Sequence, residues 1–152
     1  MDHSQRAYDL FYQGYNCAQS VFLAFTDLTG LDDETALRIS SSFGGGMGRL
    51  RETCGAFSAI IMVAGMLYGY TAPKDLKAKS EHYALVQELA ARFREKNGSI
   101  VCRELLGLSG KSDPNVPART DEYYKKRPCP EICRIAAGIL DEYIASKGER
   151  ND

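Results

Sequence analysis

The sequence predicts an all-α protein: a single compact helical domain over residues 1–152, with about six or seven helices around a buried, Gly/Ala-rich central helix. Three observations predict this class. Apolar residues recur at helical spacing, strand patterns are weak throughout, and cap residues and glycines divide the chain at short intervals. The 44% of hydrophobic residues and 26% of charged residues are ordinary for a globular domain of this length.

The N-terminal part contains two predicted helices, over residues 7–14 and 17–30. Asn16 is the predicted N-cap of the second helix, and Gln19 three residues later completes a capping-box pattern. Gly30 ends this helix because glycine readily adopts the left-handed conformation that closes helices.

The next helix begins at Asp32 or Asp33 and runs into a cluster of glycines at residues 44–48. Thr53 is the predicted cap of the central helix, and residues 53–73 contain no charged residue, which is about the length of a membrane span. The strongly apolar part is short and is interrupted by glycines and tyrosines, so a buried central helix is the preferred interpretation and no membrane partner is expected.

The C-terminal half begins with a long helix that stops at Asn97-Gly98, followed by a short helix that Ser99 caps. Residues 110–127 are polar and contain two prolines, so they predict a loop with at most one irregular turn, in which residues 123–127 are solvated. The last helix opens at residues 128–131. The residues predicted to face inward on the long helix are Leu76, Tyr83, Val86, Leu89, Ala90 and Phe93.

The balance of charges limits the classes of molecule that the protein is expected to bind. Nineteen Lys+Arg against twenty Asp+Glu give a net charge of -1, which excludes the excess basic charge of a nucleic-acid-binding protein. Polar residues stand where a signal peptide would be apolar, so we expect a cytoplasmic protein with reduced thiols. The apolar helix is compatible with a homodimer. His3, in an expected mobile terminus, and His82 leave little for a histidine-based site.

The cysteines carry the functional signal. Cys17, Cys54, Cys102 and Cys129 all fall at predicted helix N-termini, where unpaired N–H groups and the helix dipole favour a thiolate over a thiol. A thiolate is the form that binds metals and attacks disulfides. Cys133 lies one turn beyond Cys129 and is expected in the core. It is the alternative to Cys129 as the fourth site residue.

A second signal comes from small residues around the same positions. Glycines allow the backbone to approach a ligand closely and to turn through positive φ, and their exposed N–H groups can cradle an anion or donate to sulfur. A flexible corner between two helices is the alternative interpretation. The candidate supporting residues are Gly44, Gly45, Gly46, Gly48 and Gly55.

These motifs resemble a known family. Residues 14–19 (GYNCAQ), the glycine cluster and residues 53–56 (TCGA) are similar to the four-cysteine CGAxxG family, named C_GCAxxG_C_C, whose members are described as redox-active helical proteins of about this length. Cys102 and Cys129 fall where the third and fourth family cysteines would lie. The resemblance therefore covers nearly the whole chain.

The sequence departs from the family motif at one position, and two cysteines compete for the place of the fourth family cysteine. Ala59 replaces the final glycine of the motif, which reads CGAFSA here, so a small residue is retained. Cys129 is matched to the fourth cysteine because the residue four positions later, here Cys133, is usually aliphatic in the family. The family is similar to the non-haem part of split-Soret cytochromes, which implies an iron–sulfur centre on the four cysteines.

Three hypotheses follow. The first is a redox or electron-transfer protein in which Cys17, Cys54, Cys102 and Cys129 converge on one site, ligate an iron–sulfur cluster and exchange electrons with an unknown redox partner. The second is a metal-free thiol–disulfide protein or sensor that uses a pair such as Cys17 and Cys54. The third is a zinc-stapled or plain helical interaction module. Whether the protein is an enzyme stays open.

Overall fold

A computed structural model describes residues 2–151, with side chains to residue 148. It confirms the all-α class: across this range there are six helices of eight or more residues and four shorter ones, and the one isolated bridge joins Thr53 to Val101. The helices are α1 (His3–Tyr12), α2 (Cys17–Ala24), α3 (Thr26–Thr29), α4 (Asp33–Ser41), α5 (Gly44–Met47), α6 (Gly55–Tyr68), α7 (Leu76–Asn97), α8 (Cys102–Leu106), α9 (Asp121–Lys126) and α10 (Cys129–Asn151).

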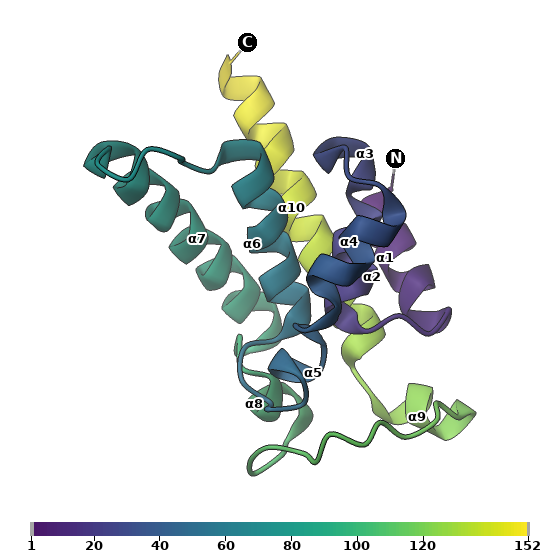
Figure 1. Ribbon diagram of the computed structural model, residues 1–152. Coiled ribbons are helices and arrows are strands. Elements are labelled where there is room, and N and C mark those ends of the chain that lie inside the picture. Colours follow the sequence, from purple (N-terminus) through teal and green to yellow (C-terminus); the bar gives the residue numbers. More distant parts are fainter. Residues whose placement is uncertain (1, 152) are drawn as a thin grey trace.

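The long helices form a bundle around α6 and α10 (Figure 1). Helix α1 packs along α10, and α2 packs against α6, α1 and α4. The short helices α5, α8 and α9 gather at the lower end of the bundle in Figure 1, where α10 begins and α7 ends. The fold therefore collects short helices and loops at one end, and this end carries the candidate site.

The predicted capping box at the start of α2 is confirmed. The Asn16 side chain accepts a hydrogen bond from the Gln19 N–H (2.8 Å), and the Gln19 side chain accepts one from the Asn16 N–H (3.2 Å). The Asn16 amide also donates to the Ser41 carbonyl at the end of α4 (3.2 Å). The predicted helix over residues 17–30 is divided at Phe25 into α2 and α3, and Gly30 ends α3 in the left-handed conformation.

Helix α6 is the buried central helix that the sequence predicts. Every residue from Gly55 to Ile60 is buried, because α2, α5, α7 and α10 all contact this helix and the small residues let them approach closely. Thr53 is not its cap: Cys54 occupies the N-cap position and Thr53 pairs with Val101. None of the helices described by the structure is long and apolar enough to cross a membrane.

The inward face predicted for α7 is wrong at two positions. Leu76 is 70% exposed and Tyr83 is 51% exposed, whereas Leu89 and Phe93 are fully buried. Figure 1 shows the reason: the N-terminal half of α7 leans away from the bundle, so the apolar stripe is covered near the C-terminal end.

Two other boundaries differ from the prediction. Within residues 110–127 the short helix α9 takes the place of an irregular turn, because Thr120 caps it with a hydrogen bond from the Tyr123 N–H (3.2 Å). Ser99 does not cap α8, which begins at Cys102 after the N-cap Val101; the Ser99 hydroxyl instead accepts from the Val101 N–H (2.9 Å).

His3 is not in a mobile terminus. It is 6% exposed and stacks on Phe25 with ring centroids 4.2 Å apart. Its ring nitrogens lie 2.7 Å from the Asp141 carboxylate and 3.0 Å from the Asp27 carboxylate. Burial between two carboxylates ties the first turn of α1 to α3 and α10, a contact that sequence spacing does not reveal.

Candidate functional site: a cavity lined by cysteines and arginines

A short antiparallel pairing of two loops sets Cys54 beside Cys102. The Cys54 N–H donates to the Ile100 carbonyl (2.7 Å), and the Cys102 N–H donates to the Glu52 carbonyl (2.6 Å). Because these bonds lie on either side of the Thr53–Val101 bridge, the starts of α6 and α8 are fixed next to each other although 48 residues separate the two cysteines in the sequence.

The glycine cluster forms a left-handed turn. All residues from 45 to 49 have positive φ, between 63° and 70°, and Arg51 follows with φ of 61°. The turn is closed by hydrogen bonds from the Met47 N–H to the Phe43 carbonyl (3.2 Å) and from the Gly48 N–H to the Gly44 carbonyl (2.9 Å). A non-glycine residue in this conformation costs about 1 kcal/mol, so a run of this kind needs several glycines.

Two glycines are required by the closeness of the cysteines. A Cβ atom on Gly55 would lie 2.6 Å from the Cys17 sulfur, and one on Gly46 would lie 2.5 Å from the Cβ of Cys102. A Cβ atom on Gly44 would likewise overlap the side chain of Asn16. The glycines therefore permit a close approach of the backbone to two cysteines, and the predicted approach to a ligand stays a prediction.

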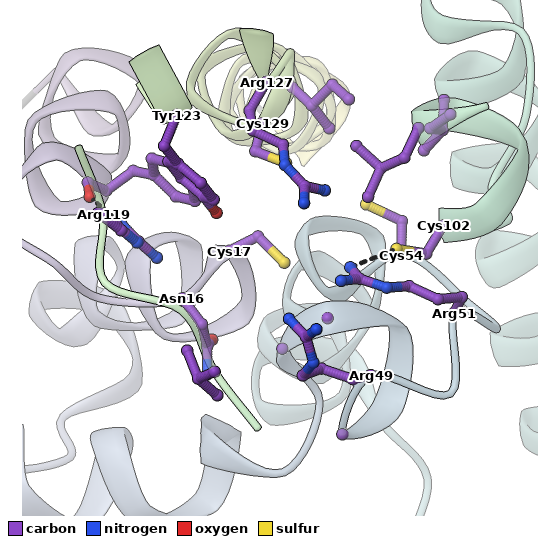
Figure 2. A pocket seen from close by; sticks show the side chains of 18 of the residues that line it. Asn16, Cys17, Arg49, Arg51, Cys54, Cys102, Arg119, Tyr123, Arg127 and Cys129 are labelled. Carbon is purple, nitrogen blue, oxygen red and sulfur yellow. Dashed lines mark hydrogen bonds between the residues drawn. The ribbon is translucent and has the colours of Figure 1, made fainter. Parts of the chain in front are cut away.

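Cys17, Cys54, Cys102 and Cys129 all line one cavity of about 270 Å³ (Figure 2). Each lies at a helix start, as predicted: Cys17, Cys102 and Cys129 are the first residues of α2, α8 and α10, and Cys54 is the N-cap of α6. Gly44, Gly45 and Gly48 line the same cavity.

Cys133 lies outside the cavity lining. It is completely buried one turn into α10, and its thiol faces the Cys17 carbonyl at 3.8 Å. Burial raises the pKa of the Cys133 thiol well above its ordinary value. Cys133 is therefore surrounded as a core residue is, and Cys129 is favoured as the fourth cysteine of the cavity.

Cys17 is the cysteine whose surroundings most favour a thiolate. A hydrogen bond from the Cys54 thiol has the largest effect, and although burial opposes it, the N–H groups of Gly45, Ala18 and Gly55 also point at the sulfur, so the pKa of Cys17 falls to about 6. The pKa of Cys54 is raised well above its ordinary value, because its proton is the one shared with Cys17 and because it is buried. The pair therefore divides into a thiolate and a proton donor.

The other two cavity cysteines are held as thiols by burial. Desolvation raises the pKa of Cys129 to about 12, and the negative charge on Cys17 adds to this effect. Desolvation also raises the pKa of Cys102, although the Arg51 guanidinium, 3.7 Å from the Cys102 sulfur, opposes the rise. A cation or metal entering the cavity would be needed to deprotonate all four cysteines.

Four arginines surround the cysteines: Arg49, Arg51, Arg119 and Arg127. Figure 2 shows the guanidinium groups of Arg49, Arg51 and Arg127 directed toward the middle of the cavity, around Cys17, and that of Arg119 at the edge of the cavity beside Tyr123. No aspartate or glutamate of the described chain lines this cavity, and none forms an ion pair with these four arginines. The cavity is therefore strongly positive although the whole chain carries a net charge of -1.

Sequence reasoning missed these arginines. Residues 123–127 were expected to be a solvated loop, but Tyr123 and Arg127 line the cavity because α9 folds back over it. Arg119 reaches the carbonyls of Phe11 (2.6 Å) and Tyr15 (2.9 Å), which fixes the incoming loop on α1. The two prolines of a polar segment mark a loop, but they do not indicate which surface the loop covers.

The arrangement can bind an anion, stabilise a thiolate and hold soft metal ions through sulfur. Within the described residues, no three Cys, His, Asp or Glu side chains stand close enough together to hold a single metal ion.

The fold and the site define an all-α protein with four cysteines at helix starts around one basic cavity. The chain belongs to the C_GCAxxG_C_C family, described as "putative redox-active protein", whose model matches residues 15–143. The resemblance drawn from the motifs is thereby confirmed, and the match includes all four cavity cysteines. Comparisons with curated proteins and with solved structures found no match.

The left-handed turn generates a stability prediction. Gly46→Ala places a methyl group against Cys102 and 2.8 Å from the Arg51 backbone, at φ of 68°. Gly30→Ala is the matched control, since it has φ of 74° and open space around it. We expect unfolding free energies lower by about 1 kcal/mol for Gly30→Ala and about 3 kcal/mol for Gly46→Ala, measured by urea denaturation. Equal losses would mean that the turn does not pack tightly against the site.

The state of Cys17 generates a pH prediction. In metal-free protein, iodoacetamide should modify Cys17 with a half-maximal rate near pH 6, because the thiolate is the reacting form. Cys129, in the same cavity, is the internal control and should resist at pH 8, because its pKa is about 12. Peptide mass spectrometry separates the two sites. A Cys17 rate that rises only above pH 8 would contradict the assigned thiolate.

The same shift has a consequence for stability. The pKa of Cys17 is lower in the folded chain than its ordinary value of 9.0. The Cys17 thiolate therefore contributes to the free energy of unfolding, and this contribution is complete above pH 9 and is lost as the pH falls through about 6. Cys54→Ala removes the donated hydrogen bond and should move the midpoint of Cys17 modification to higher pH. Cys54→Ser keeps a donor and should leave the midpoint closer to pH 6.

Proposed function

We propose that this chain is a cytoplasmic redox protein in which Cys17, Cys54, Cys102 and Cys129 hold an iron–sulfur cluster and exchange electrons with a redox partner. The observation that carries the proposal is that these four cysteines, drawn from four separate helix starts, line one cavity. Membership in a family described as redox-active supports the redox part.

The chemistry of the cavity fits such a group. Four cysteine thiolates are the usual ligands of iron–sulfur clusters, and four thiolates bring more negative charge than the cluster's iron ions and sulfides balance. The four arginines supply the compensating charge, and no carboxylate of the described chain competes with the thiolates in the lining. The cavity volume of about 270 Å³ leaves room beside the sulfurs.

A bound cluster would supply one-electron chemistry, and the chain's own residues would set its potential. N–H groups from the glycine turn and from the start of α6 point at the Cys17 sulfur and stabilise negative charge there. The Arg51 guanidinium does the same at Cys102. Both contacts favour the more negative, reduced form, so they raise the reduction potential.

The cluster proposal is tested on protein purified without oxygen. Iron and acid-labile sulfide, with visible charge-transfer absorbance, should accompany the wild-type chain. Serine substitution at Cys17, Cys54, Cys102 or Cys129 should remove most of the iron, because a ligand is lost. Cys133→Val is the control and should keep the iron. The absence of iron and sulfide from the wild-type protein, or iron loss in Cys133→Val but not in Cys129→Ser, would overturn the assignment.

A second function is favoured by the contact between Cys17 and Cys54. A thiolate hydrogen-bonded to a thiol is the arrangement in which one sulfur attacks a substrate disulfide and the other resolves the mixed disulfide. The Cys17 thiolate would attack one sulfur of the substrate disulfide and release the other as a thiolate, and Cys54, on losing its proton, would displace the second substrate sulfur. The pair would be left as an intramolecular disulfide, and the substrate would leave as two thiols after taking one proton from Cys54 and one from water. This function needs no metal.

The thiol–disulfide function predicts that oxidised glutathione lowers the count of free thiols by two in metal-free protein, reversibly with dithiothreitol. Cys17→Ser and Cys54→Ser should abolish the change, since either leaves one sulfur without its partner. Cys102→Ser serves as the matched control and should retain it. If no intramolecular crosslink forms between residues 17 and 54, this second function is excluded.

A further inference from the structure

One charged side chain in the cavity is buried without a carboxylate partner. Arg51 is 5% exposed; its Nε donates to the Ser112 hydroxyl (3.0 Å), and one terminal nitrogen lies 3.7 Å from the Cys102 sulfur. Neither partner carries the full negative charge of a carboxylate. Because taking a guanidinium out of water is costly unless it is paired with an anion, this position is suited to a negatively charged occupant.

The positive charge extends beyond the ring of sulfurs. In Figure 2, Arg119 lies on the side of Cys17 opposite to Cys54 and Cys102, and Arg49 lies on a third side. The Arg119 guanidinium is held by two carbonyls and rests on the Phe11 ring at 4.1 Å, so its orientation is fixed. A rigid guanidinium is well arranged to receive a planar carboxylate or a phosphate.

Arg127 points into the same space, and among the described residues its side chain has one aromatic, hydrogen-bonding or ion-pair partner, the ring of Tyr123. Its guanidinium faces the Tyr123 ring at 5.2 Å, and the described residues give it no hydrogen bond and no ion pair. A guanidinium that stacks on one aromatic ring and donates to no acceptor of the described chain keeps its N–H groups available for a ligand in the cavity.

The rest of this space is apolar. Its walls include side chains from the segment that joins α8 to α9 and from the ends of α8 and α1, among them Phe11, Leu105, Leu106, Val116 and Pro117. The cavity volume of about 270 Å³ is several times the roughly 30 Å³ that one water occupies in the liquid. Such a wall suits an organic body better than a fully hydrated inorganic ion.

We propose that the cavity binds a small organic anion, a carboxylate or phosphate ester with an apolar body, which Arg119 and Arg127 contact beside the cysteines. The binding site goes beyond the proposed redox function and does not depend on it. The competing interpretation is that these arginines only balance the charge of a cluster on the thiolates, and the experiment is designed to separate the two.

The test is titration calorimetry of anaerobically purified protein with benzoate and with phenyl phosphate, using benzamide as the neutral match of benzoate. We expect saturable binding of at least one of the two anions, with Kd below about 1 mM, and at least about tenfold weaker binding of benzamide. Arg127→Gln should weaken anion binding about tenfold or more, because a charged hydrogen bond is lost.

Arg94→Gln is the matched control, because it removes the same charge from the exposed last turn of α7, outside the cavity. It should leave anion affinity unchanged. The inference is overturned if neither anion binds saturably, if benzamide binds as well as benzoate, or if Arg94→Gln weakens binding as much as Arg127→Gln. Loss of iron in Arg127→Gln with unchanged anion binding also overturns it. Iron and sulfide analysis of the same wild-type sample reports separately on the cluster proposal.

Discussion

The site depends on the left-handed path of the backbone from Gly45 to Arg49. This turn reverses the chain between α4 and α6, so that residues 51–54 can pair with residues 100–103 and Cys54 can lie beside Cys102. It also presents the Gly45 N–H to the sulfur of Cys17. L-residues in a right-handed conformation could not follow this path, and side chains on the glycines would occupy the space of the cysteines.

A second constraint is electrostatic. Cys17 can be a thiolate in a half-buried place because a neighbouring thiol and three N–H groups face its sulfur, whereas Cys129, which lacks them, has its pKa raised to about 12 by burial. The arginines extend this preference for negative charge across the whole cavity. Identical side chains at similar helix positions therefore differ in protonation because of the atoms that face them, and helix dipoles alone do not decide the outcome.

Local signals in the sequence predicted local structure well. The capping box of Asn16 and Gln19, the stop at Gly98 and the helical periodicity all depend on neighbours within a few residues, and the structure confirms them. The burial of His3 and the placing of Arg119 and Arg127 in the cavity depend on contacts across more than 100 residues or on the path of a polar loop. Spacing carries no information about such contacts. The exposure of Leu76 has the same origin, since it reflects where the bundle ends.

The distribution of the cavity cysteines along the chain also bears on the order of folding. Spacings of 37, 48 and 27 residues mean that the cavity closes only after three long loops have been brought together, and each closure has an entropic cost that local helix formation does not. The helices can form early, whereas the complete cavity belongs to the finished fold. A molecule that contacts all four cysteines therefore binds the native chain and not its folding intermediates. Such binding stabilises the native chain by mass action.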